Sequence, residues 1–164
     1  MFKVIVAGSR SFNNYDLLKR KLDHLLANKD LATVHIVSGT ARGADQLGER
    51  YAKERGCQLD LFPANWARYG KSAGYERNAR MASHADALVA FWDGDSPGTR
   101  NMITTMLQEL IDEAASIRRA IDNDELTCEE TSTFENILDA IEDELLAYDF
   151  IPSGSEDWDE DIPF

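Results

Sequence analysis

The sequence contains little cysteine: only Cys57 and Cys128 occur in 164 residues. Two cysteines cannot build the disulfide framework of a small secreted protein, which favours a reducing compartment. Neither lies in a Cys-x-x-Cys pair and the three histidines are scattered, so the sequence predicts no zinc site. No apolar run approaches the roughly 20 residues of a membrane-spanning helix, and residues 1–12 lack a signal-peptide pattern. We therefore expect a cytoplasmic protein without membrane contacts.

Charge is distributed unevenly along the chain. The sequence has 30 acidic and 17 basic side chains, which gives a net charge of −13. Residues 1–105 hold almost all of the Lys and Arg, whereas residues 109–164 contain only Arg118 and Arg119 as basic residues. A chain that is negative overall repels the phosphates of DNA and RNA, so we expect no strong direct binding to nucleic acid. The more basic part can still offer a locally positive site to a small anionic ligand.

Short apolar runs alternate with segments of helical spacing in the first hundred residues. The expected strands are 2–7, 34–37, 59–62 and 87–92, and the expected helices are 16–27, 43–55 and 76–83. On the first helix, the side chains expected to be buried are Leu17, Leu18, Leu22, Leu25 and Leu26. Continuous apolar strands separated by helices indicate a parallel sheet covered on both faces. The predicted fold class is therefore α/β, with a doubly wound parallel sheet.

Two further amphipathic segments follow. One begins at Thr99, a plausible N-cap, and carries apolar residues from Ile103 to Ile121, while the other runs from Phe134 to Tyr148. They predict a helical hairpin that extends the core or forms a homodimer interface. The predicted organisation is a ligand-binding domain at 1–112, the hairpin at 113–149 and a mobile acidic tail at 150–164.

Three glycine-containing loops follow expected strands: GSRSF, SGTARGAD and WDGDSPGTRN. In a parallel sheet the loops at the carboxyl ends of the strands meet at one edge, where ligands bind. Glycine lets a ligand approach the backbone, while helix N-termini and arginines neutralise phosphate. The sequence therefore predicts a phosphate-bearing, nucleotide-like ligand. The candidate ligand-binding residues are Gly8, Ser9, Arg10, Ser38, Gly39, Thr40, Arg42, Gly43, Asp45, Arg77, Asn78, Asp93, Gly98 and Thr99.

Several roles within this set stay open. The loop at 38–45 is no Walker A loop, because the Gly-Lys-Ser/Thr ending is missing. Asp45 either caps the following helix or binds a ribose hydroxyl. Asp93 and Asp95 would repel a phosphate unless Mg²⁺ lay between them. Otherwise these two aspartates bind sugar hydroxyls or point outward.

Residues 65–80 combine aromatic and basic side chains. Aromatic rings offer a flat surface for a base, and the arginines offer contacts to an anion. The alternative is a loop whose aromatic residues are anchored in the core. We expect this anchoring for Trp66 or Tyr69.

The segments VIVAGSRSF, VSGTARGAD, GYERNARM and FWDGDSPGTRN resemble the YspA-like branch of the SLOG superfamily, which also contains the LOG phosphoribohydrolases and the DprA/Smf DNA-processing proteins. The resemblance covers residues 2–112 and implies a Rossmann-like fold that binds nucleotides or nucleotide-derived ligands. In the phosphoribohydrolases, an arginine before a methionine-containing helix and a glutamate after Gly-Thr carry the chemistry. Arg77 matches the arginine, but Arg100 follows Gly-Thr here. Glu76 or Asp45 would have to supply the carboxylate for N-glycosidic cleavage, so the candidate catalytic residues are Arg77, Glu76 and Asp45.

The end of the sequence, DWDEDIPF, resembles the acidic tip of bacterial single-stranded DNA-binding protein (SSB), which docks onto replication and repair enzymes. The resemblance implies that the Phe164 ring fills an apolar pocket, that the chain-end carboxylate meets a basic residue, and that the upstream acids steer the encounter. The candidate partner-binding residues are Asp157, Trp158, Asp159, Asp161, Ile162, Pro163 and Phe164. The alternative is an acidic tail that only increases solubility.

Together, these features predict a protein that binds a nucleotide-like ligand and docks through its DEDIPF tail onto SSB-interacting DNA replication or repair enzymes. One alternative is a phosphoribohydrolase-like N-glycosidase of nucleoside monophosphates. Another is an SSB-tail mimic that acts as an adaptor or inhibitor without a small ligand. No resident metal is assigned, and Mg²⁺ enters only as a companion of the nucleotide.

Overall fold

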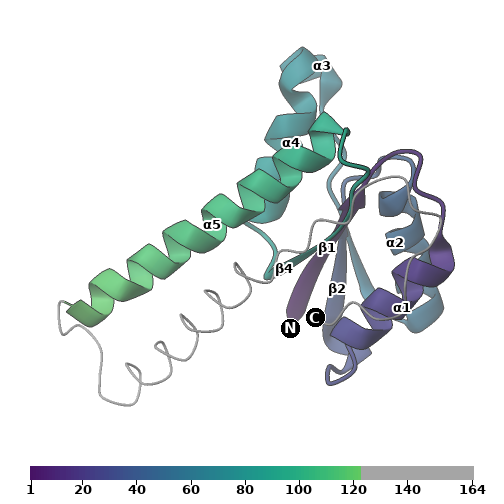
Figure 1. The fold of residues 1–164 in the computed structure, drawn as a ribbon, viewed down its shortest axis with the longest axis horizontal. Helices are drawn as coiled ribbons and strands as arrows, with labels where there is room; N and C mark the ends of the chain where they lie inside the picture. Colours follow the sequence, from purple (N-terminus) through teal and green to yellow (C-terminus); the bar gives the residue numbers. More distant parts are fainter. Residues whose placement is uncertain (123–164) are drawn as a thin grey trace. The chain divides into compact units, whose positions relative to one another are not determined.

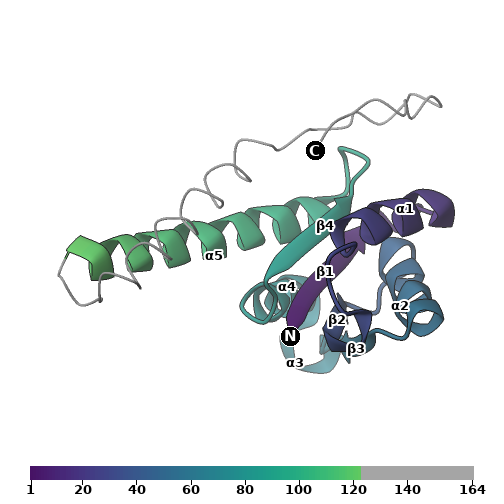
Figure 2. The same cartoon turned by 90° about the horizontal axis from the view of Figure 1, so that it is seen from below.

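The computed structural model describes residues 1–122; the predicted second amphipathic segment and the acidic tail lie outside the described residues. Its elements are β1 (Phe2–Gly8), α1 (Tyr15–Leu25), η1 (Leu31–Thr33), β2 (Val34–Ser38), α2 (Ala44–Arg55), β3 (Gln58–Leu61), α3 (Trp66–Tyr69), η2 (Gly70–Ser72), α4 (Ala73–Ala82), β4 (Ala87–Phe91) and α5 (Pro97–Asp122). The strands form one sheet in the order β3-β2-β1-β4, and every pairing is parallel (Figures 1 and 2). This confirms the predicted α/β, Rossmann-like fold class.

The direction in which strands are added to the sheet reverses at β1. β2 and β3 extend the sheet on one side of β1, and the chain then returns through α4 so that β4 pairs with the other side. In doubly wound sheets, ligands bind beyond the carboxyl ends of the strands at such a reversal. The topology therefore places the loops that follow β1 and β4 at the expected ligand site.

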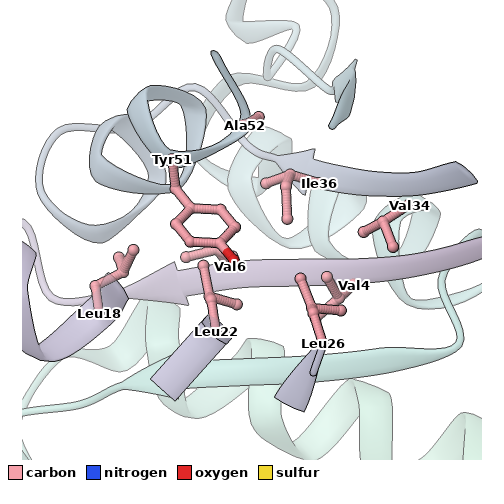
Figure 3. Packing of buried hydrophobic residues seen from close by; sticks show 9 residues of the cluster. All are labelled: Val4, Val6, Leu18, Leu22, Leu26, Val34, Ile36, Tyr51 and Ala52. Atoms are coloured by element: carbon pink, nitrogen blue, oxygen red, sulfur yellow. The ribbon is translucent and has the colours of Figure 1, made fainter. Parts of the chain in front are cut away.

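One face of the sheet packs against α1 and α2. Val4 and Val6 of β1 point to this face because successive side chains of a strand alternate, and they form one cluster with leucines of α1 and with Tyr51 of α2 (Figure 3). Tyr51 is fully buried, and its hydroxyl donates a 2.8 Å hydrogen bond to Asp23. The ring is therefore buried without an unpaired polar group.

The opposite face of the sheet is covered by α4, which lies across the sheet from α1 and α2 (Figure 2). Ile5 and Val37 alternate with the residues that face α1 and α2, and both are fully buried. Met81 of α4 is buried as well. Both faces of the central strands are therefore covered, which explains why these strands are continuous apolar runs.

The last described helix, α5, begins at Pro97, two residues before the N-cap predicted at Thr99. Proline suits the first position of a helix because its missing N–H has no partner there in any case. Met102 and Met106 are the buried residues of its apolar face. They lie one position before Ile103 and Leu107, from which the sequence predicts the buried stripe.

Two burial expectations differ from the structure. Leu25 is 40% exposed, because it is the last residue of α1 and the chain turns there so that Leu26 occupies the buried position. β4 is only half-buried along its length. As an edge strand it pairs with β1 alone, so it is less covered than the strand predicted from its apolar sequence.

Residues 65–74, for which the sequence predicts neither helix nor strand, are largely helical in the structure. They contain α3 and η2, and α4 begins at Ala73 instead of Glu76. The side chain of Asn65 accepts a 3.0 Å hydrogen bond from the backbone N–H of Arg68, which caps the short helix. In contrast, α2 ends at Arg55, where the helix predicted over 43–55 also ends, and the following Gly56 has a φ of 74° in the left-handed region.

The chain divides between Met106 and Leu107 into two units, Met1–Met106 and Leu107–Phe164. All candidate ligand-binding residues belong to the first unit. Within residues 1–122, no helix combines the length and the apolarity that crossing a membrane requires.

Candidate functional site

Three loops at the carboxyl edge of the sheet meet through two glycines. A Cβ on Gly8 would clash with the carbonyl oxygen of Phe91 and would lie 2.8 Å from the Cβ of Ala44. A Cβ on Gly43 would clash with the carbonyl oxygen of Ser9, and Gly43 has a φ of 84°, which side chains disfavour. The loops after β1, β2 and β4 therefore come together because both positions lack a side chain.

Arg77 reaches this edge from α4. Its side chain is 16% exposed, and its Nη1 donates a hydrogen bond to the carbonyl oxygen of Gly39. Its Nε donates a 3.0 Å hydrogen bond to Asn78, and Oδ2 of Asp45 lies 3.8 Å from Nη1. A Cβ on Gly39 would clash with the guanidinium. A third glycine is thus needed to admit Arg77 beside Asp45.

A second positive charge lies near Arg77. Burial lowers the pKa of Arg77, the carboxylate of Asp45 raises it, and the positive charge of Arg10 lowers it. Both guanidinium groups stay charged at neutral pH. Two like charges at a partly desolvated position destabilise each other, and an anion that contacts both relieves this repulsion. The electrostatics of this edge therefore suit an anionic ligand.

Asp45 closes the loop between β2 and α2 and does not cap α2. The N-cap is Gly43, which makes no side-chain cap bond, whereas Oδ2 of Asp45 accepts a 3.2 Å hydrogen bond from the backbone N–H of Ala41. Burial raises the pKa of Asp45, although the Ala41 hydrogen bond and the charge of Arg77 lower it. The capping role predicted for Asp45 is therefore wrong, because its carboxylate points back into its own loop. Binding of a ribose hydroxyl stays a prediction.

Ser38 is hydrogen-bonded to Glu49, a residue of the candidate site that is not among the residues predicted from the sequence. Its hydroxyl donates a 2.8 Å hydrogen bond to Oε1 of Glu49 and accepts one of 3.1 Å from the backbone N–H of Thr40. Glu49 follows Asp45 by four residues, so one turn of α2 places both carboxylates on one face. The charge of Glu49 also raises the pKa of Asp45. This four-residue spacing is the signal that could have identified Glu49.

Ser9, Asp93 and Thr99 organise the loops after β1 and β4. Oγ of Ser9 accepts a 3.1 Å hydrogen bond from the backbone N–H of Asp93, and the carboxylate of Asp93 accepts one of 2.8 Å from the backbone N–H of Ser96. The backbone hydrogen bond from Ser96 and the hydroxyl of Ser9 lower the pKa of Asp93. Thr99 is buried, and its hydroxyl donates a 3.0 Å hydrogen bond to Ser96. These bonds fix the loops, and contact of the same groups with a ligand stays a prediction.

The remaining candidate ligand-binding and catalytic residues are exposed, except for Asn78, whose side-chain amide is buried. The exposed group consists of Arg10, Thr40, Arg42, Glu76 and Gly98. Asn78 is buried, and its Nδ2 donates hydrogen bonds of 3.1 Å to the Gly98 carbonyl oxygen and 2.8 Å to Oδ1 of Asn101. It therefore fixes the start of α5 against α4. Of the candidate catalytic residues, Arg77 and Asp45 come together, whereas Glu76 makes no hydrogen bond or ion pair with either within residues 1–122.

Comparisons with known proteins identify the family to which the chain belongs. The model of the YspA, cpYpsA-related SLOG family matches residues 2–69. The Gene 61 protein of Mycobacterium phage D29 is 35% identical over 107 residues, which cover 62% of this chain and 85% of that protein. The chain belongs to the YspA, cpYpsA-related SLOG family. Membership of this SLOG family suggests a nucleotide-related ligand. No solved structure matches the chain.

The loop after β2 contains one residue with an unusual backbone conformation. Thr40 has a φ of 60°, and it is the one non-glycine residue with positive φ within residues 1–122. A β-branched side chain disfavours the left-handed region, at a cost of roughly 1–2 kcal/mol. Such conformations concentrate at ligand sites, where the surrounding structure holds them. Thr40 lies directly between Gly39 and the loop that Asp45 closes.

A second polar cluster of the SLOG fold lies at His35, Asp60 and His84. The Asp60 carboxylate is 3.1 Å from Nδ1 of His35 and 3.0 Å from Nε2 of His84. Burial alone would raise the pKa of Asp60, but its hydrogen bonds with the two histidines outweigh burial and lower it. Two histidines that appear scattered in sequence therefore meet, because β3 follows β2 in the sheet and the chain returns through α4. Within residues 1–122, no cluster of His, Cys, Asp and Glu is arranged to hold a metal ion.

Proposed function

We propose that this SLOG protein binds a nucleotide or nucleotide-derived ligand whose anionic group contacts Arg10 and Arg77. The observation that carries the proposal is the Arg77 guanidinium, which is mostly buried and lies beside Asp45, and whose pKa the positive charge of Arg10 lowers. A buried cation needs partners that compensate for its lost hydration. Asp45 at 3.8 Å and hydrogen bonds to the Gly39 carbonyl oxygen and to Asn78 supply part of this compensation, and a bound anion would add to it.

Two carboxylates of α2 favour a sugar-bearing anion over inorganic phosphate as the ligand near Arg77. Asp45 and Glu49 share one face of α2, and both come from the element that begins at the glycine loop. Carboxylate oxygens accept hydrogen bonds from the hydroxyls of a ribose. A positive group next to such acceptors suits a molecule that carries a phosphate and sugar hydroxyls together, as a nucleotide does.

Replacing Arg77 tests this proposal. The variant Arg77→Ala should weaken the binding of a nucleoside monophosphate by about 1.5–3 kcal/mol, or roughly 10- to 150-fold. Arg77→Lys should weaken binding less, because it keeps the charge and loses the planar fork. Isothermal titration of the full chain with the four ribonucleoside 5′-monophosphates measures both effects.

The matched control is Arg20→Ala, which removes an exposed arginine from α1. It should leave affinity unchanged. Equal loss in Arg20→Ala and Arg77→Ala would indicate a nonspecific charge effect and contradict the assigned site. If no monophosphate binds the wild type, a nucleotide-binding role for this site is wrong.

Hydrolysis is a second candidate, because Asp45 has a raised pKa and lies beside Arg77, the residue that matches the arginine of the phosphoribohydrolases. A carboxyl group that stays protonated at higher pH can act as a general acid. Release of free base from a nucleoside monophosphate tests this activity. The activity should disappear in Asp45→Asn, whereas binding without any base release would leave the protein a binder.

We further propose that residues 157–164 dock onto SSB-interacting replication or repair enzymes. The support is the sequence DEDIPF, in which apolar residues follow a run of carboxylates. A peptide of this kind places an aromatic ring in an apolar pocket while its acids steer the approach. Removal of Phe164 should reduce affinity for such an enzyme by more than about 2 kcal/mol, or thirtyfold.

Competition separates docking from a general acidic effect. An SSB tail peptide should displace the full chain from the enzyme. Asp157→Asn together with Asp159→Asn should mainly slow association, and the effect should shrink as salt is added. If the peptide does not compete, or if the chain without Phe164 binds equally well, the acidic segment is no docking peptide.

A further inference from the structure

An exposed aromatic and basic segment lies between β3 and the helix that carries Arg77. Trp66 of α3 is 58% exposed and Tyr69 is 37% exposed, so neither anchors the segment in the core as the sequence analysis expects. None of residues 65–72 is buried. Tryptophan is highly buried on average, and exposed apolar groups of this kind mark interaction sites. The segment therefore presents its rings to something other than its own core.

The Trp66 ring of α3 lies against the face of α4 that carries Arg77. A Cβ on Gly74 in α4 would lie 4.0 Å from Cη2 of Trp66, so the indole ring covers the first turn of this helix. Arg77 and Asn78 follow Gly74 by three and four residues, which places all three on one face. The rise from Gly74 to Arg77 is about 4.5 Å. The ring thus lies about one helical turn from the residue at which the anionic group of the ligand is placed.

Positive charge accompanies the rings. The guanidinium of Arg68 lies 5.0 Å from the centroid of the Tyr69 ring, and Lys71 is exposed one residue beyond Gly70. Between residues 61 and 80, the basic residues are Arg68, Lys71, Arg77 and Arg80, and the acidic residue is Glu76. Aromatic faces among cations are the surface on which the bases of anionic nucleotides stack.

We infer that Trp66 is the base-stacking wall of the ligand site, and that the ligand is therefore a nucleotide with an intact purine or pyrimidine base. This inference rests on the proposed function and deepens it, because a sugar phosphate without a base would satisfy Arg77 equally well. About one turn of α4 separates Gly74, which lies beside the Trp66 ring, from Arg77. In the inferred arrangement, one molecule therefore places its phosphate at Arg77 and its base on Trp66. A protein partner on the same rings is the competing explanation.

The test compares ligands that differ by the base. The full-length wild type and Trp66→Ala are titrated with AMP, GMP, CMP, UMP and ribose 5-phosphate. Trp66→Ala should bind the preferred monophosphate about tenfold more weakly, or worse, and should bind ribose 5-phosphate as the wild type does. Trp66→Phe should recover most of the affinity, since it restores an aromatic face. Arg77→Ala should lose affinity for all of these ligands.

Tyr75→Ala is the matched control. Tyr75 is an aromatic residue of α4 that is 51% exposed, close to the 58% of Trp66, but it lies about 100° around the helix from Gly74. This variant should bind every ligand as the wild type does.

Each outcome decides between explanations. If the wild type binds monophosphates no better than ribose 5-phosphate, or if Trp66→Ala leaves their ratio unchanged, the stacking wall is wrong while the anion site stands. A parallel loss for both ligands would make Trp66 structural, and this too overturns the inference. If the wild type binds none of the probes, the proposed function fails, and the inference fails with it. Stacking would also change the indole emission on titration in a way that Trp66→Phe abolishes.

Discussion

The two units of the chain differ most in charge. Residues 1–106 contain 15 basic and 11 acidic residues, a net charge of +4, whereas residues 107–164 contain 2 basic and 19 acidic residues, a net charge of −17. The total of −13 therefore hides a first unit that is positive. An overall charge argues against nucleic-acid binding by the whole chain, but it says little about one edge of a sheet. The net charge of the whole chain therefore does not exclude an anionic ligand in the first unit.

The two units should also differ in how substitutions affect stability. In the first unit, the residues of the candidate site hold the loops together, so changes there alter folding as well as binding. In the acidic segment at 150–164, the predicted docking residues follow a Pro-Ser-Gly-Ser break, so changes there should alter binding alone. Three substitutions and one deletion test this difference, from the largest expected effect on stability to the smallest.

Gly43→Ala should have the largest effect. The new Cβ would clash with the carbonyl oxygen of Ser9 at a φ of 84°. We expect the free energy of unfolding to fall by about 3 kcal/mol, because overpacking against backbone adds to strain. Urea denaturation followed by circular dichroism measures the change. Gly98→Ala is the control, since a Cβ there meets nothing within 4 Å. Equal stability of the two variants would refute the close packing of the loops.

Asp60→Asn should have a smaller effect that depends on pH. The pKa of Asp60 is lowered in the fold, so its carboxylate stabilises the folded state at pH values above the ordinary pKa of a carboxyl group. This contribution is lost as the pH falls through the lowered pKa. We expect a loss of about 1 kcal/mol at pH 6. The difference from the wild type should shrink as the pH falls below about 4. A difference that stays constant from pH 7 to pH 3 would exclude an ionised Asp60 as its source.

Thr40→Gly should change stability in the opposite direction. Glycine relieves the left-handed strain at residue 40 but adds entropy to the unfolded chain, so we expect a gain of about 0.5 kcal/mol. Nucleotide affinity should fall if the fixed loop takes part in binding. Thermal denaturation and titration of the same sample measure both quantities. A less stable variant would show that the hydroxyl or methyl group of Thr40 stabilises the fold.

Deletion of Phe164 should not change stability. The residue lies beyond the acidic run in the unit that we expect to act by docking. The midpoint of thermal unfolding should match that of the wild type. Binding to an SSB-interacting enzyme should nevertheless decrease, as proposed above. A clear fall in the midpoint would mean that the acidic segment contributes to folding, and the contrast between the two units would then disappear.

Much of the fold is readable from the sequence because its signals are local. The apolar runs of β1 and β2 and the stop of α2 at Gly56 depend on neighbouring residues and are found where they are expected. α3 is missed because its start depends on one capping bond from Asn65. The half-buried state of β4 is missed because its sequence resembles that of a central strand, and only the strand order places it at an edge.

The features of the candidate site also fall into those that the sequence predicts and those that it does not. The sequence is enough to predict that glycine loops follow three strands, that arginines lie near them, and that the family is one of SLOG proteins. Those properties follow from residue type and spacing. Other contacts are visible only in the folded structure. Arg77 passes over Gly39 to lie beside Asp45. Ser38 is hydrogen-bonded to Glu49, and two histidines meet at Asp60. These contacts join residues from different elements, and their partners are fixed by strand order and helix packing, which no local pattern encodes.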